Sequence, residues 1–182
     1  MRRTTKKIRN EGVIIALLNT CHVGRLGTVG KNGYPMVKPL NFVYHGGKVY
    51  FHSAQEGEKI DDIRHDNRVC FEVDLPIAFV KSKVSPCRAS YLYRSVIITG
   101  RAFIVKDGAE RVLALHRLME KYERGCGYRE FPEDKLNLTA IIRIDIEEMA
   151  GKEDLGKEQS VREEVQKALE QKMPLPIVLE RD

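Results

Sequence analysis

The chain has 182 residues, of which 42% are hydrophobic and 31% are charged, and its formal net charge is +5. This length suits one domain with an appended tail, and the ordinary glycine and proline content excludes a fibrous repeat or a wholly disordered chain. Acidic and basic residues are interspersed along most of the sequence, so a surface dedicated to nucleic acid is not indicated. The one dense basic cluster, residues 2–9, is interpreted as a solvated end rather than a nucleic-acid-binding arm.

Cysteine and histidine residues are scattered without the spacing of a metal site. Cys21, Cys70, Cys87 and Cys126 form no Cys-x-x-Cys pair, so we expect reduced, mostly buried thiols and no bound metal. The apolar run at residues 13–18 is too short to span a bilayer, and no secretory leader is recognised. We therefore expect a cytoplasmic protein that binds neither membrane nor nucleic acid.

The first part of the sequence is typical of a meander of antiparallel strands. Apolar residues at helical spacing predict a helix over residues 6–19, and a strand follows over 21–29. The Asn-Gly step in residues 30–33 and the glycine pair in 45–48 predict two hairpin turns, and the segment between them contains two prolines that exclude a helix. An aromatic, β-branched strand follows at 49–51. Two consecutive hairpins predict three antiparallel strands.

The middle of the sequence interrupts this alternation and then resumes it. Residues 55–66 predict a loop that enters a short helix, and 68–74 alternate as a strand. A looser segment containing two prolines is expected over 75–87. Residues 88–106 are predicted to form one long strand, or two strands broken near Gly100.

The clearest helix is predicted to begin at Asp107, which is spaced from Glu110 as in an N-terminal capping box. Its apolar residues recur at three- and four-residue intervals, and the glycines of residues 125–127 end it. Residues 137–147 alternate as another strand. The charged segment 157–172 predicts a surface helix, which the prolines that follow terminate.

Together these segments predict a mainly β fold, a small β-barrel of about six antiparallel strands with flanking helices. Closing the sheet, or nearly closing it, hides the hydrogen-bonding edges of its strands. We expect one domain over residues 1–152 and a charged tail or helix over 153–182. No Gly-x-Ser-x-Gly, His-Glu-x-x-His, phosphate-loop or dinucleotide fingerprint is present, so no catalytic residue is named.

Four polar residues, Lys38, His52, Ser53 and Lys59, stand near the end of the predicted hairpin and at the start of the short helix. Hydroxyl, imidazole and ammonium donors beside a helix start suit a phosphate group. From the pattern alone, four unrelated polar residues on an exposed hairpin are the simpler interpretation.

Four longer segments resemble the flavin-binding split barrel of the pyridoxamine 5′-phosphate oxidase superfamily: VKPLNFVY, VYFHSAQEGEKIDDI, NRVCFEVD and YRSVIITGRAFIV. Their order and spacing fit from about Cys21 to about Lys152, and the resemblance is closest to the smaller branch that includes the nitroimidazole-resistance (Nim) proteins. The resemblance implies a homodimer with FMN in clefts between the subunits. It also implies an FMN-dependent oxidoreductase that reduces a small organic molecule, with a nitro compound as the acceptor that the family suggests.

The same resemblance implies which residues contact the cofactor. One strand lies along the flavin ring, the next strand and the helix after it line the ribityl phosphate, and a later strand supplies one polar contact. In that order the residues are Lys38, Pro39, Leu40 and Asn41; Phe51, His52, Ser53 and Lys59; and Ser95. Lys59 is expected to neutralise the phosphate charge.

The sequence departs from the oxidases at two places. They tend to carry a basic pair before the short helix, where this chain has Glu58-Lys59, and their C-terminal substrate-binding segment has no counterpart at residues 174–182. Oxidation of pyridoxamine phosphate is therefore not expected. Two alternatives stay open, a non-catalytic flavin-binding or haem-binding protein, and a deazaflavin in place of FMN.

Overall fold

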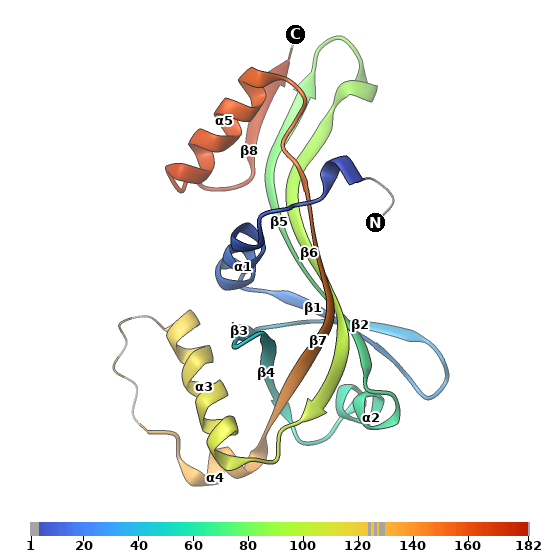
Figure 1. Cartoon of the computed structure of the whole chain (residues 1–182), viewed down its shortest axis with the longest axis vertical. Helices are drawn as coiled ribbons and strands as arrows, with labels where there is room; N and C mark the ends of the chain where they lie inside the picture. The colour runs from blue at the N-terminus through green and yellow to red at the C-terminus, as the bar shows by residue number, and fades with distance from the viewer. Residues whose placement is uncertain (1–3, 124, 126, 128–129, 182) are drawn as a thin grey trace. The chain divides into compact units, whose positions relative to one another are not determined.

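The computed structural model describes residues 4–123, 125, 127 and 130–181, and these contain one sheet of eight strands (Figure 1). The hydrogen-bonded order is β2-β1-β5-β6-β7-β4-β3, and β8 pairs with β5. The predicted mainly β fold with flanking helices is confirmed, with eight strands rather than about six among the described residues. The strands are β1 (Gly24–Val29), β2 (Pro35–Leu40), β3 (Val43–His45), β4 (Lys48–Ala54), β5 (Arg68–Ser82), β6 (Ser90–Ile104), β7 (Thr139–Asp154) and β8 (Ile177–Arg181).

Helices flank the sheet. Within the part of the chain that the structure describes, none has the length and apolar character needed to cross a bilayer. The α-helices are α1 (Glu11–Thr20), α2 (Glu58–His65), α3 (Gly108–Tyr122), α4 (Glu133–Leu138) and α5 (Gln159–Glu170), and the short 3-10 helices are η1 (Thr4–Lys6) and η2 (Pro86–Arg88).

The described chain divides into two compact units. The first unit comprises the residues up to 17, residues 74–96 and those from 150 onward, and the second comprises 18–73 and 97–149. Strands β5, β6 and β7 contribute residues to both units. Each unit contains a buried apolar cluster of its own.

In the first unit, the C-terminal segment is part of the core. Strand β8 pairs in parallel with β5, with Ala78 opposite Ile177, and α5 lies beside β8 (Figure 1). The charged segment therefore forms the predicted helix, but one face of that helix is buried. The buried cluster of this unit consists of Ile77, Ala78, Val80, Leu92, Val161, Val165 and Leu179.

Strand β5 is longer than predicted. The prediction of a looser segment over 75–87 is wrong for the first half of that range, because β5 continues to Ser82. Pro76 lies within the strand and is exposed. A proline tolerates this place only where its missing N–H is not required by a neighbouring strand. Of the expected segment, the part after Ser82 forms the loop that contains η2.

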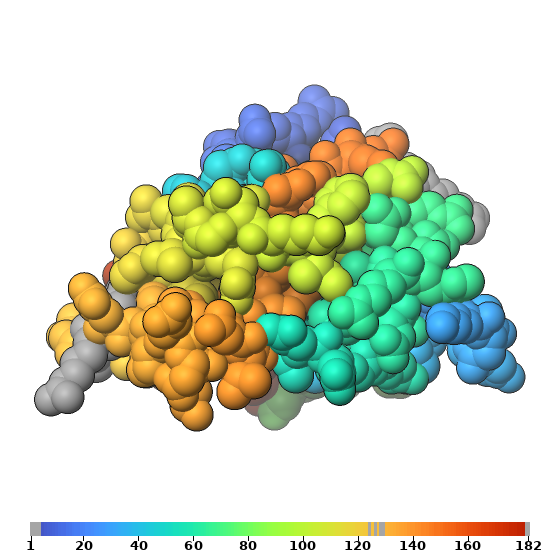
Figure 2. Space-filling model, turned by 90° about the horizontal axis from the view of Figure 1, so that it is seen from below, coloured from blue at the N-terminus to red at the C-terminus, as the bar shows by residue number. Residues whose placement is uncertain are grey.

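In the second unit, both predicted hairpin turns are confirmed. Strands β1 and β2 pair from Gly24 opposite Leu40 to Val29 opposite Pro35, and strands β3 and β4 pair closely across the next turn. Gly46 has φ 58° and its neighbour Gly47 has φ 76°, the left-handed values that tight hairpins require. Figure 2 shows the tip of the first hairpin, in blue, projecting beside the green surface that contains α2.

Helix α3 begins as predicted. The side chain of Asp107 accepts a hydrogen bond of 2.7 Å from the backbone N–H of Glu110, which caps the helix. The helix packs against β3 and β4. The buried cluster at this contact consists of Val43, Tyr50, Val105, Ala114, Leu118 and Ile141.

Strand β6 passes through Gly100 without a break. A side chain is excluded at this position, because a Cβ atom on Gly100 would lie 2.2 Å from the backbone oxygen of Asp145 in β7. The glycine therefore marks a close approach of two strands and not the interruption that the sequence left open.

The cysteines differ from expectation. Cys21 is buried, whereas Cys70 and Cys87 are exposed, so the prediction of mostly buried thiols is wrong for the described part of the chain. Cys126, within the predicted end of the long helix, and Arg2 and Arg3 of the basic N-terminal cluster lie outside the described residues.

Candidate functional site

The structure brings together Lys38 from β2, His52 from β4 and Lys59 from α2. Burial lowers the pKa of Lys59, and the charge of Lys38 lowers it further. Burial also lowers the pKa of His52, with the charge of Lys59 as the second cause, so this imidazole is neutral at pH 7. Two cations and a neutral imidazole thus converge where two strands and a helix meet.

Lys38 holds a partly buried position in this cluster. Its Nζ lies 2.8 Å from Oε2 of Glu58 and 3.8 Å from Oδ2 of Asp62. Among the described residues, this buried nitrogen nevertheless makes no hydrogen bond of good alignment. Asp62 in turn accepts a hydrogen bond of 2.7 Å from Oγ1 of Thr28 in β1, and both of these residues are buried. The ammonium of Lys38 is therefore held in place but retains unused hydrogen-bonding capacity.

Lys59 has no carboxylate partner among the described residues, and its Nζ lies 5.4 Å from the ring centroid of Phe51. Helix α2 begins after Gly57, which has φ 115° and offers no side chain to cap the helix. The amides of Ile60 and Asp61 donate to the carbonyl oxygen of Gly57, which leaves, among the described residues, the N–H groups of Glu58 and Lys59 at this end to meet a ligand anion. The start of α2 and Lys59 present donors to the same region.

The remaining predicted residues do not all join this cluster. Asn41 donates from Nδ2 to the carbonyl oxygen of His22 at 3.3 Å, and Ser95 belongs to the first unit. Phe51 is fully buried. Of the others, Leu40, Ser53 and Ser95 are half-buried, and Pro39 and Asn41 are exposed. Within the cluster, His52 is exposed as a whole residue, although the atoms around its ring desolvate it enough to lower its pKa.

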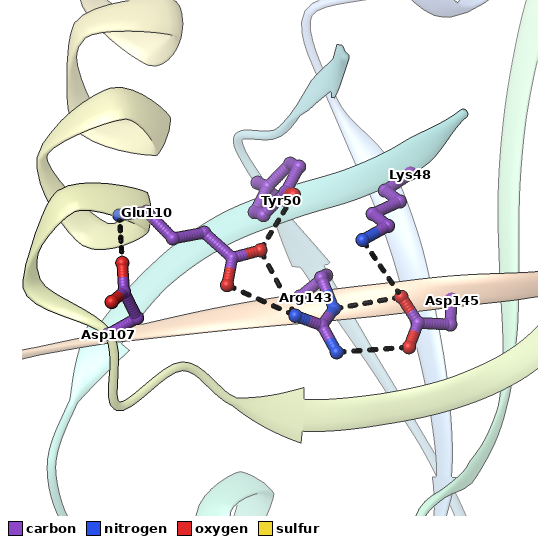
Figure 3. Close-up of polar contacts among 6 residues, drawn as sticks. All are labelled: Lys48, Tyr50, Asp107, Glu110, Arg143 and Asp145. Atoms are coloured by element: carbon purple, nitrogen blue, oxygen red, sulfur yellow. Dashed lines mark hydrogen bonds and ion pairs between the residues drawn. The ribbon is translucent and has the colours of Figure 1, made fainter. Parts of the chain in front are cut away.

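A second polar network joins α3 to the sheet (Figure 3). Glu110 accepts a hydrogen bond of 2.9 Å from the hydroxyl of Tyr50 and pairs with Arg143, whose Nη1 lies 3.1 Å from both of its carboxylate oxygens. Arg143 also pairs with Asp145, which Lys48 approaches at 3.9 Å. Every charge in this network has an opposite charge beside it, so we assign it a structural role.

Burial raises the pKa of Tyr50 to about 12, and the hydrogen bond to Glu110 acts in the same direction. Folding therefore favours the neutral phenol. The stabilisation of the folded state by this neutral phenol is complete below pH 10 and is lost as the pH rises through about 12. We expect Tyr50→Phe to lower the free energy of unfolding by about 1 kcal/mol. It should also remove a tyrosine that ionises well above the usual range in an absorbance titration. Tyr34→Phe, at a side chain that is 70% exposed, is the control and should change neither result.

Sequence reasoning missed the buried pair Thr28 and Asp62. One signal was available for Asp62, because it lies between Ile60 and Ile63 and so belongs to the apolar face of a short amphipathic helix. A carboxylate on such a face requires a partner. Nothing local indicates that the partner is Thr28, which comes from a strand far earlier in the sequence.

Solved structures share this fold. A protein assigned to 5-nitroimidazole antibiotic resistance from Bacteroides thetaiotaomicron is 24% identical, with a TM-score of 0.71 over 80% of this chain and 85% of its own. The flavocytochrome Anf3 from Azotobacter vinelandii is 23% identical, with a TM-score of 0.74 over 88% and 76%. An FAD and haem binding protein from Mycobacterium smegmatis is 20% identical, with a TM-score of 0.76 over 90% and 80%. No curated protein sequence matches the chain.

The sheet topology and these likenesses define a split-barrel protein. The family model described as pyridoxamine 5′-phosphate oxidase matches residues 10–153, which is most of the chain. The chain belongs to this family. The resemblance predicted from the sequence is confirmed, including the similarity to a nitroimidazole-resistance protein.

Proposed function

We propose that the chain binds FMN by its phosphate at Lys38 and Lys59 and acts as an FMN-dependent oxidoreductase that reduces a small organic acceptor. The observation that carries this proposal is the convergence of two lysines at an uncapped helix start. One of them has unused donors and, among the described residues, the other has no carboxylate partner.

The residues present fit a phosphate group. A dianion beside Lys38 and Lys59 would accept hydrogen bonds from both ammonium groups and from the first amides of α2, and it would relieve the repulsion that lowers the pKa of Lys59. The neutral imidazole of His52 adds a donor or an acceptor without adding charge.

FMN, when bound, supplies the electron transfer, and the protein supplies binding, orientation and access. We assign the acceptor to small organic molecules and propose a nitro compound as one such acceptor, since the chain shares its fold with a protein of nitroimidazole resistance. A flavin-binding or haem-binding protein without catalysis is the second candidate. Its support is the fold shared with a flavocytochrome and with a protein that binds FAD and haem.

We further propose that the chain forms a homodimer with FMN between the subunits. The outer face of strands β2, β1 and β5 supports this. On this face Gly27 of β1 lies between Val37 of β2 and Cys70 of β5, so no side chain covers the backbone of the middle strand at this point. Val37 is 65% exposed and Val29, near the end of the same face, is 40% exposed. A subunit on this face would remove that apolar surface from water. Sedimentation of the FMN-loaded protein as a monomer would refute the proposed dimer.

The absorbance spectrum of the purified protein, with FMN added if it is colourless, tests the cofactor. Flavin bands that remain with the protein on gel filtration support the proposal, and a haem Soret band favours the second candidate. No binding of FMN in a fluorescence titration at micromolar concentrations would contradict the proposal.

Replacing Lys59 with alanine tests the phosphate contact directly. We expect FMN affinity to fall by about tenfold or more, since a hydrogen bond to a charged group contributes about 1.5–3 kcal/mol. Lys31→Ala removes the same charge from an exposed turn of the first hairpin and should leave FMN affinity nearly unchanged. Equal affinities of the Lys59→Ala and wild-type proteins for FMN would rule out the role of Lys59.

A further inference from the structure

Glu58 is the one acidic residue at the start of α2 that contacts a lysine of the proposed phosphate site, as far as the described residues show. Its Oε2 lies 2.8 Å from Nζ of Lys38, and its side chain is 57% exposed, compared with 24% for Lys38. The carboxylate thus reaches from the helix start to the partly buried ammonium. The carboxylate therefore contacts the same ammonium group that would donate a hydrogen bond to a bound phosphate.

The charges around Lys38 and Lys59 explain why this contact matters. Asp62 is buried, lies 3.8 Å from Lys38 and is hydrogen-bonded to Thr28, so it stays in place whether or not an anion binds. With Glu58 also ionised, two carboxylates oppose the two ammonium groups. Only Glu58 is exposed enough to turn away into solvent.

We infer that Glu58 is a specificity-determining residue that competes with the cofactor phosphate for Lys38, an inference that rests on the proposed function. In the free protein the carboxylate pairs with the ammonium. When a phosphate binds, Glu58 must leave Lys38 or remain beside a second negative charge. The residue therefore weakens binding of phosphorylated flavins and leaves binding of the unphosphorylated flavin, riboflavin, unaffected.

A carboxylate in the first turn of a helix also has an ordinary structural role, because it interacts favourably with the helix dipole. That role predicts a small loss of stability when Glu58 is neutralised and no gain in ligand affinity. Competition with the phosphate predicts that FMN affinity rises when the charge of Glu58 is removed. The sign of the change in affinity separates the two.

The test compares Glu58→Gln with Glu56→Gln, which removes a charge of the same sign two residues earlier from an exposed side chain. Dissociation constants for FMN and riboflavin are measured by flavin fluorescence at fixed ionic strength. For Glu58→Gln we expect FMN to bind about fivefold more tightly, as removal of a partly screened repulsion at close range permits, and riboflavin to bind unchanged. Glu56→Gln should alter FMN affinity by less than about twofold.

A second measurement keeps Glu58 testable if no flavin binds. Inorganic phosphate is titrated into both variants and the wild-type protein while the ring signals of His52 are followed by NMR, since His52 is sensitive to the charge at Lys59. Tighter phosphate binding by Glu58→Gln without flavin binding would uphold the role of Glu58 and overturn the proposed function. Unchanged affinities of Glu58→Gln for FMN and for phosphate, or an equal gain for riboflavin, would overturn the inference.

Discussion

FMN affinity is expected to fall by about a hundredfold to ten-thousandfold when Lys38 and Lys59 are both replaced with methionine. Each replacement removes a charge-assisted hydrogen bond of about 1.5–3 kcal/mol to the phosphate while keeping most of the aliphatic length of the side chain. Methionine at position 38 also leaves Asp62 with its hydrogen bond from Thr28. Fluorescence titration with FMN measures the loss.

Riboflavin provides the matched ligand for this experiment, because it lacks the phosphate that the lysines are proposed to bind. Its affinity should change little in the double variant. An equal loss of riboflavin and FMN binding would show that the substitutions disturb the fold or the ring site, and the assignment of the phosphate site would then be wrong. A circular dichroism spectrum like that of the wild-type protein is the accompanying check on folding.

Gly100→Ala is expected to lower the free energy of unfolding by about 3 kcal/mol. The added Cβ would meet the backbone oxygen of Asp145 at 2.2 Å, and a strand backbone inside a sheet has no freedom to move aside cheaply. Urea denaturation followed by circular dichroism measures the change. A loss below about 1 kcal/mol would contradict the close approach of β6 and β7 at this point.

Gly108→Ala is the matched control for that variant. Gly108 is exposed at the first position of α3, and an added Cβ meets no atom within 4 Å. Alanine is favoured over glycine in helices, so this substitution should leave stability unchanged or raise it by up to about 1 kcal/mol.

Much of the second unit could be predicted from local sequence, because short-range chemistry determines its turns and helix start. Positive φ at Gly46 and Gly47 and the cap at Asp107 each depend on residues within one turn of the chain. The course of β5 beyond residue 74 could not be predicted in the same way. Past Pro76 it pairs with β8, which lies far away in the sequence, as well as with β6.

The candidate site was predictable in part for the same reason. Lys59 stands two residues after a glycine at a helix start, a local pattern that suits an anion. From that pattern alone, unrelated polar residues on an exposed hairpin were still the simpler interpretation. The contact between Lys38 and Glu58 joins an edge strand to that helix, and no spacing rule links them. The family resemblance predicted that the strand with Lys38 and the helix with Lys59 both contact the cofactor. The structure added the buried Asp62, whose carboxylate lies beside Lys38.

The parallel pairing of β8 with β5 has a consequence for how the protein is made on the ribosome. Ile177, the strand partner of Ala78, is synthesised long after Ala78 itself, so Leu179 is the last member of the first unit's cluster to be made. Until then, Ile77 and Val80 lack part of their apolar cover, a condition that favours aggregation of nascent chains. The first unit therefore cannot complete its cluster until β8 has been synthesised, whereas all residues of the second unit are available before α5 has been made.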